Sequence, residues 1–111
     1  MALILAYKNR RLARDITILD ADGITITPGS TDRVRISIGR EGETALLTVD
    51  SQSPTANGSS LTKGAANRLI LDADDLGFTP GTYTMLVDYY DADDGPEWKT
   101  VSRQCFVLEN T

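Results

Sequence analysis

The sequence predicts an all-β protein that folds as an antiparallel β-sandwich or barrel, and three observations support this prediction. Apolar and polar residues alternate with a period of two in several short segments, as they do in strands with one buried face. Clusters of Asp, Gly, Pro and Asn separate these segments at intervals of about 8–12 residues, which is the spacing of strands in sandwiches. The chain has 111 residues, 41% of them hydrophobic, which suits one globular domain. We expect about seven or eight strands.

The first expected element is a hairpin whose arms are residues 15–20 and 24–27. Residues 20–23 (Asp-Ala-Asp-Gly) form its turn, because Asp and Gly tolerate the backbone angles that a tight turn requires. The clearest alternation follows in residues 32–38, where three β-branched apolar residues face one way and two arginines and a serine face the other. Residues 45–49 form the strand that returns after the next turn.

The second half of the chain begins with residues 50–60, which we interpret as a loop because Ser, Asn, Gly and Pro are frequent there. Residues 68–72 form a short strand and residues 82–90 a long one. Residues 91–96 form a hairpin loop before the last strand, residues 98–108, whose apolar residues indicate two faces and a bulge that switches between them. The inward faces of these strands supply the expected core: Ile16, Ile18, Val34, Ile36, Ile38, Leu69, Leu71, Tyr83, Met85, Val87 and Phe106.

The residue types present exclude several classes of enzyme. The chain has no histidine and one cysteine, so it lacks a histidine-based catalytic triad, a histidine-ligated metal and an internal disulfide. Cys105 lies beside apolar neighbours in a strand, and we interpret it as a buried, unreactive thiol. The carboxylates lie in polar turns, with no apolar pocket to prepare them for acid–base catalysis. We therefore expect no catalytic residues, no cofactor and no enzymatic activity.

The acidic loop at residues 91–97 is the strongest candidate for a metal site. Calcium binds several carboxylate oxygens on a flexible loop, and this loop carries three Asp residues and one Glu. The EF-hand pattern requires Asp or Asn at its fifth position and Gly at its sixth, but Gly95 and Pro96 occupy these positions here. We therefore interpret the loop as a solvated hairpin turn and expect no metal site.

The first 14 residues differ from the rest of the chain in charge. Four of the 11 Lys and Arg residues lie here, before the first of the 16 acidic residues. We predict that residues 1–14 form a basic arm, with a strand or extended segment at its start, and that residues 15–111 form the sandwich domain. Such an arm contacts an acidic protein neighbour, is solvated, or contacts phosphates, and we favour protein contact. The expected contact residues are Leu3, Ile4, Leu5, Lys8, Arg10, Arg11 and Arg14.

The overall charge and the N-terminus bear on location. The net charge of −5 does not favour nucleic acid or an anionic membrane as a partner. The apolar run at the start is too short for a signal peptide or a membrane span, and the basic residues follow it rather than precede it. We expect synthesis in the cytoplasm, no export through a signal peptide and no membrane contact.

Aromatic side chains on the last two long strands form a second candidate surface: Tyr83, Tyr89, Tyr90 and Trp98. Aromatic rings at a surface serve as platforms for sugars, but the spacing of these residues along strands favours packing in the core or at an interface. Both interpretations remain open at the level of the sequence.

Several segments in a fixed order carry a family resemblance: DITILDADG at 15–23, VRISI at 34–38, RLILDADD at 68–75, PGTYT at 80–84 and CFVLE at 105–109. This order resembles the small immunoglobulin-like β-sandwich domains of tailed-bacteriophage virion proteins. The type it resembles most is the N-terminal domain of phage baseplate upper proteins. The Pro-Gly-Thr-Tyr element, with Leu-Asp-Ala-Asp upstream, is the most suggestive part.

The resemblance implies an immunoglobulin-like fold and a structural, non-catalytic role in a phage virion. It implies phage capsid or tail proteins as partners, and a homo-oligomer within the particle. The family joins this domain to a longer receptor-side or coiled-coil region, whereas this chain stops at Thr111. We therefore expect a separate decoration or cement subunit, or a tail or baseplate accessory subunit. The alternative is a soluble β-sandwich module that binds a carbohydrate or a peptide.

Overall fold

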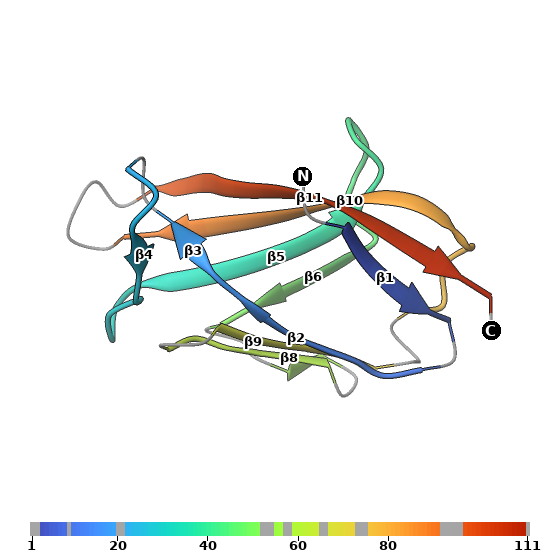
Figure 1. Cartoon of the computed structure of the whole chain (residues 1–111), viewed down its shortest axis with the longest axis horizontal. Helices are drawn as coiled ribbons and strands as arrows, with labels where there is room; N and C mark the ends of the chain where they lie inside the picture. Colours follow the sequence, from blue (N-terminus) through green and yellow to red (C-terminus); the bar gives the residue numbers. More distant parts are fainter. Residues whose placement is uncertain are drawn as a thin grey trace.

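Two β-sheets face each other across an apolar interior (Figure 1). The computed structural model describes residues 3–8, 10–19, 22–51, 55–56, 59–64, 67–72, 76–91 and 97–110. Within these residues the chain forms eleven strands, three of them only two residues long, and no α-helix. The described part contains no helix with the length and apolar character needed to cross a bilayer. The prediction of an all-β chain is confirmed, and the two facing sheets are those of a β-sandwich.

The larger sheet has five strands. In spatial order they are β1 (Leu3–Tyr7), β11 (Trp98–Glu109), β10 (Gly81–Tyr90), β5 (Arg33–Gly39) and β6 (Leu47–Asp50). Neighbouring strands are antiparallel except for β1 and β11, which run parallel. The sheet is therefore mixed rather than purely antiparallel as the sequence predicted.

The smaller sheet lies below the larger one in Figure 1. Its strand order is β2 (Leu12–Ile16), β9 (Asn67–Leu71), β8 (Ser59–Thr62) and β7 (Thr55–Ala56). After β2 the chain leaves this layer and forms β3 (Ile18–Leu19), which pairs with β4 (Thr25–Ile26) and contacts β11. One extended stretch of chain thus connects the two layers.

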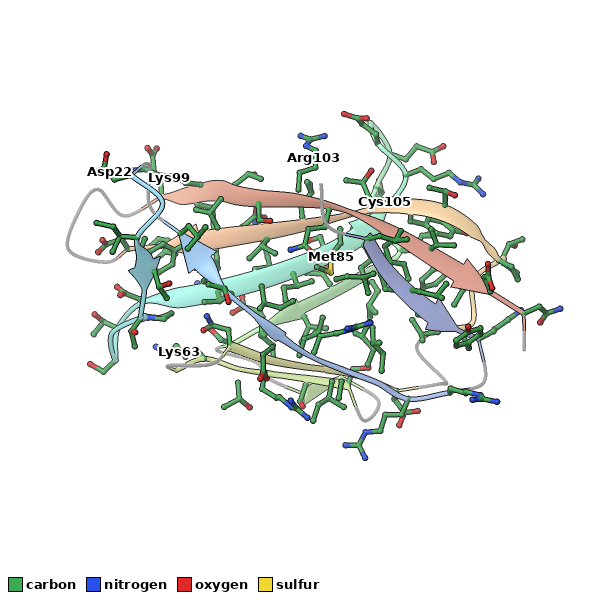
Figure 2. The ribbon with its side chains drawn as sticks, viewed as in Figure 1. Asp22, Lys63, Met85, Lys99, Arg103 and Cys105 are labelled. Carbon is green, nitrogen blue, oxygen red and sulfur yellow. The ribbon has the colours of Figure 1, made fainter. Side chains whose placement is uncertain are left out.

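All eleven residues that the sequence assigns to the core are buried. The period-two pattern explains this, because alternate residues of β5 and β10 point between the sheets. Met85 of β10 is fully buried in this interior (Figure 2). The same cluster also includes Ile4 and Ala6 from the predicted arm, Leu61 directly after the predicted loop, and Val49, Leu76, Tyr89 and Leu108.

The N-terminal segment differs most from the prediction. Residues 3–7 form an edge strand of the larger sheet, with Ile4 5% exposed and Ala6 2% exposed. Residues 12–16 form β2, an edge of the smaller sheet. The chain from residue 3 onward therefore belongs to the sandwich, and the expected boundary between a basic arm over 1–14 and a domain over 15–111 is not present. The run over residues 3–7 is apolar on both faces. Its sequence alone therefore does not reveal that one of these faces packs against the core of the same chain.

The stretch assigned to a loop over residues 50–60 also differs from the prediction. It contains β7 and the start of β8, and Leu61 within β8 is fully buried. Ser59 is buried because its hydroxyl oxygen accepts a hydrogen bond from the Asp72 backbone N–H at 2.8 Å. Serine disfavours regular structure when its hydroxyl competes with the backbone, but here a distant residue satisfies that hydroxyl.

The expected bulge in the last strand is present. Val87 pairs with Ser102 while its neighbour Asp88 pairs with Thr100, so Val101 is an additional residue in β11. Beyond it, Phe106 and Leu108 point inward and are buried. Val101 at the bulge packs partly against the core, whereas Lys99 and Thr100 before it are exposed.

Candidate protein-docking surface

The outward face of the larger sheet carries a cluster of polar and aromatic contacts around Asp88 and Trp98, together with an apolar stripe. The apolar stripe consists of Leu3, Leu5 and Tyr7 on β1, which alternate with the buried Ile4 and Ala6. Leu3 is 62% exposed and Tyr7 is 36% exposed, while Leu5 is half-buried. A strand at a sheet edge thus presents three large apolar side chains away from the core.

The side chains of β11 beside β1 extend this stripe. Leu3 lies opposite Cys105 and Leu5 lies opposite Val107, and paired residues of neighbouring strands point to the same face. Cys105 and Val107 are both half-buried. Cys105 therefore faces outward beside Leu3 and is only half-buried, which corrects the prediction that its thiol is buried.

The predicted contact residues are only partly brought together. Ile4 belongs to the core and is not available for a partner. Lys8 donates its backbone N–H to the Glu109 carbonyl at 2.9 Å, and the Arg10 guanidinium carbon lies 5.7 Å from the Tyr7 ring centroid. These two cations therefore lie at the end of the apolar stripe.

The other two predicted cations lie farther along the chain. Arg11 is exposed in the connection between the sheets, and Arg14 is exposed on β2 of the smaller sheet. Arg14 pairs across the sheet with Leu69 of β9. It is therefore not part of the surface formed by β1.

At the opposite end of the outward face, a buried carboxylate connects three strands. Asp88 of β10 is 7% exposed. One of its oxygens accepts hydrogen bonds from Arg35 Nε at 3.2 Å and from Arg35 Nη2 at 2.9 Å. Its other oxygen accepts a hydrogen bond from the Thr100 hydroxyl at 2.8 Å. Both oxygens are satisfied, so the group holds β5, β10 and β11 in register.

Trp98 continues this cluster. The Arg35 guanidinium carbon lies 4.2 Å from the indole centroid and that of Arg33 lies 5.0 Å away. The Tyr90 ring packs beside Trp98 at 5.6 Å, and Arg33 is also paired with Asp50 of β6 at 2.5 Å. Cation–π contacts therefore occupy the indole, so this aromatic group does not form an open platform for a sugar.

The loop between β5 and β6 rises above the outward face (Figure 1). Glu41 in this loop pairs with Arg103 of β11 at 2.6 Å, and both side chains are largely exposed. Arg103 projects from the sheet beside the loop (Figure 2). A pocket of about 180 Å³ lies against this pair, with Thr84 and Leu86 among its lining residues. Close approach of the loop requires Gly39, where an added Cβ would lie 3.0 Å from the Ala45 Cα.

A lysine and a tyrosine fix the loop that leads into β5. The Lys63 ammonium donates hydrogen bonds to the carbonyl oxygens of Gly29, Ser30 and Asp32, at 2.8, 2.8 and 2.5 Å. The Tyr89 hydroxyl donates to the Asp32 carboxylate at 2.8 Å. Burial, then the hydrogen bond to Asp32 and the negative charge of that carboxylate, raises the pKa of Tyr89 above its ordinary value. These contacts are structural, because each group is already occupied.

The acidic loop over residues 91–97 lies mostly outside the described residues. Asp91 and Glu97 are described, and residues 92–96 are not. Among the residues that the structure describes, no three Cys, Asp or Glu side chains converge as a metal site would require. The prediction that this loop binds no calcium therefore stays a prediction.

Sequence reasoning missed the contribution of Tyr7 and the cluster around Asp88. Tyr7 was visible as the third odd-numbered apolar residue of β1, two positions after Leu5. The contacts of Asp88, Arg35 and Trp98 depend on cross-strand register, which a single sequence does not supply. No family model matches the chain, and no curated protein matches it.

Proposed function

We propose that this chain is a structural subunit of a tailed-phage virion that docks on assembled capsid or tail proteins through the outward face of its larger sheet. The observation that carries the proposal is the apolar stripe of Leu3, Leu5 and Tyr7, with Lys8 and Arg10 at its end. An apolar surface with a polar rim is typical of a protein interface, and cations at the rim select an acidic partner.

The strand arrangement supports an immunoglobulin-like sandwich, the fold that the family resemblance implies. One layer has the order β1-β11-β10-β5-β6, with the first strand parallel to the last one of the chain. The other layer contains β2, β9, β8 and β7, so the chain crosses between the two layers several times. Such a body is rigid and needs no catalytic site to serve as a decoration, cement, tail or baseplate accessory subunit.

The second candidate function is a soluble module that binds a peptide or a carbohydrate. The pocket beside Glu41 and Arg103 favours it, because the exposed ion pair contributes little energy and a polar ligand could displace it. The occupied ring of Trp98 argues against a carbohydrate. The apolar stripe presents three large apolar side chains away from the core, and we favour the virion role for this reason.

Co-sedimentation with phage particles assembled without this chain tests the proposal. The purified protein is expected to sediment with the particles, and Leu3→Asp is expected to weaken this binding at least about tenfold. Ile24→Asp is the matched control, since Ile24 is 63% exposed and Leu3 is 62% exposed. Ile24 lies in the β3–β4 hairpin, at the left of Figure 1 and away from β1.

Two results would overturn the proposal. The first is wild-type protein that stays in the supernatant at all salt concentrations. The second is an equal loss of binding in Leu3→Asp and Ile24→Asp. Binding to a peptide or glycan array that Arg103→Ala abolishes, without any particle binding, would favour the second candidate function.

A further inference from the structure

The edges of the two sheets differ in how they are protected from pairing with another chain. Exposed edges recruit foreign strands unless they are short, charged or covered. Among the described edges, β2 carries Arg14 and Asp15, and β7 has only two residues. Strand β6 ends in Asp50 and lies against β7 and β8 of the other sheet. Strand β1 has five residues, none of them charged or proline, and lacks these protections.

Along β1, the backbone N–H and C=O groups of alternate residues point toward the free edge of the sheet. Lys8 donates its N–H to Glu109, and the parallel ladder with β11 engages the even-numbered residues of the strand in the same way. Leu3, Leu5 and Tyr7 therefore direct their N–H and C=O groups away from β11. The Tyr7 carbonyl accepts one bond from Arg10 and retains a second lone pair.

We propose that β1 pairs antiparallel with β1 of a second copy, across a two-fold axis at Leu5. In this register Leu5 faces Leu5 of the other copy, and Leu3 faces Tyr7. The pairs formed by Leu3, Leu5 and Tyr7 then join residues whose backbone groups point to the free edge, so these groups hydrogen-bond to each other, and Ile4 lies opposite Ala6 as a non-hydrogen-bonded pair. A shift by one residue would place these groups opposite groups already bonded to β11. The two larger sheets become one ten-stranded sheet, because each contributes five strands.

The charge distribution permits this pairing. Leu3–Tyr7 contains no charge, and the two Lys8 residues lie at opposite ends of the new pair. Six residues separate them along the strand direction, or about 20 Å at roughly 3.3 Å per residue. That is about twice the screening length at physiological ionic strength, so their repulsion is small. An acidic strand of a different protein would instead form ion pairs with Lys8 and Arg10. Pairing between two copies of β1 does not use these two cations.

The contact between copies is small, so the pair is concentration-dependent. Five residues a side fall well below the roughly 20–30 residues a side of a stable interface. Each copy has a net charge of −5, so added salt is expected to strengthen the pair by screening repulsion between whole molecules. The apolar stripes of both copies join on one face, which doubles the surface available to a larger partner.

Register-specific disulfide formation tests the proposal. Leu5→Cys in a Cys105→Ser background places the only two thiols of a pair about 5.5 Å apart between Cα atoms, within the range of a disulfide. Mild oxidation is expected to give a covalent dimer. Leu3→Cys in the same background is the control, because its thiols lie roughly 13 Å apart along the strands and should crosslink at least about tenfold more slowly.

A second variant guards against misfolding of the first. Leu5→Pro removes an N–H that faces the free edge and leaves the ladder with β11 intact. Sedimentation velocity is expected to show this variant as a monomer at concentrations where the wild type forms dimers. Equal crosslinking of the two cysteine variants, or a wild type that stays monomeric at high concentration and high salt, would overturn the proposal. Neither result depends on particle binding, so this inference and the virion role fail separately.

Discussion

Leu3 of β1 lies directly opposite Cys105 of β11, and both side chains point outward from the larger sheet. Neighbouring strands are about 4.8 Å apart, which is within the Cα separation that a disulfide spans. We expect Leu3→Cys, with Cys105 retained, to form an intrachain disulfide on oxidation. Mass spectrometry of the unreduced monomer checks this. Leu5→Cys, which lies opposite Val107, is the control and should retain two free thiols in the monomer.

The alternation along β1 predicts opposite effects for neighbouring residues. Ile4→Ala removes buried apolar surface beside β11 and is expected to lower the free energy of unfolding by about 2 kcal/mol or more. Leu3→Ala is expected to change it by less than about 0.5 kcal/mol, because Leu3 is exposed. Denaturant titration measures both. Equal effects would mean that β1 does not pack on the core as described.

Because Asp88 is buried, its ion pair should contribute more to the free energy of unfolding than an exposed pair of the same type. We expect Asp88→Asn to cost about 1–3 kcal/mol, since Arg35 loses its carboxylate while Thr100 keeps an acceptor. Asp15→Asn breaks the exposed pair between Asp15 and Arg68 and should cost less than about 1 kcal/mol. Thermal or urea unfolding of the two variants compares them directly, and a larger loss in Asp15→Asn would contradict this account.

The contribution of Lys63 to the stability of the fold is expected to depend on the compact shape of its ammonium group. Three N–H donors converge on three carbonyl oxygens, and a planar guanidinium does not reproduce this geometry. Both Lys63→Met and Lys63→Arg should therefore lose about 1–2 kcal/mol of stability. Amide hydrogen exchange at Asp32, whose N–H bonds to the Gly29 carbonyl, should accelerate in both variants. Full rescue by arginine would show that charge alone matters.

The raised pKa of Tyr89 predicts that the folded protein loses stability at alkaline pH. Its pKa is raised in the folded state above the ordinary value of 10.0, so the folded protein holds the phenolic proton more tightly than the unfolded chain. The stabilisation from this group is complete below pH 10 and declines as the pH rises above that value. Unfolding curves measured across this range should show the decline in the wild type and a weaker one in Tyr89→Phe. Equal slopes would contradict the role of Tyr89.

The sequence predicted features that depend on neighbouring residues correctly, and it failed where a feature depends on residues distant in the chain. In β5, Val34, Ile36 and Ile38 alternate with polar residues, and this local pattern was enough to identify the strand and its buried face. Ser59 was misassigned because its hydroxyl is satisfied by Asp72, 13 residues away. A single sequence does not reveal which distant backbone group will meet a serine.

The candidate surface was predictable only in part for the same reason. The apolar run and the following cations identified the β1 segment as unusual, but which of its residues face a partner depends on pairing with β11. Ile4 was assigned to the contact because the run is apolar on both faces. The cluster of Arg35, Asp88 and Trp98 arises from three strands that meet only in the folded protein.

The parallel pairing of β1 with β11 determines how the sandwich responds to tension. Leu3 and Glu109 lie at opposite ends of the shared ladder, since Leu3 pairs with Cys105 and Tyr7 pairs with Glu109. A pull applied through Leu3 and Glu109 slides the two strands past each other, so that the hydrogen bonds between them bear the load together. A hairpin pulled apart at its open end would lose its hydrogen bonds one after another. The sandwich is therefore expected to resist a pulling force along its strands. Its unfolding rate under such a force depends on the β1–β11 ladder rather than on the core.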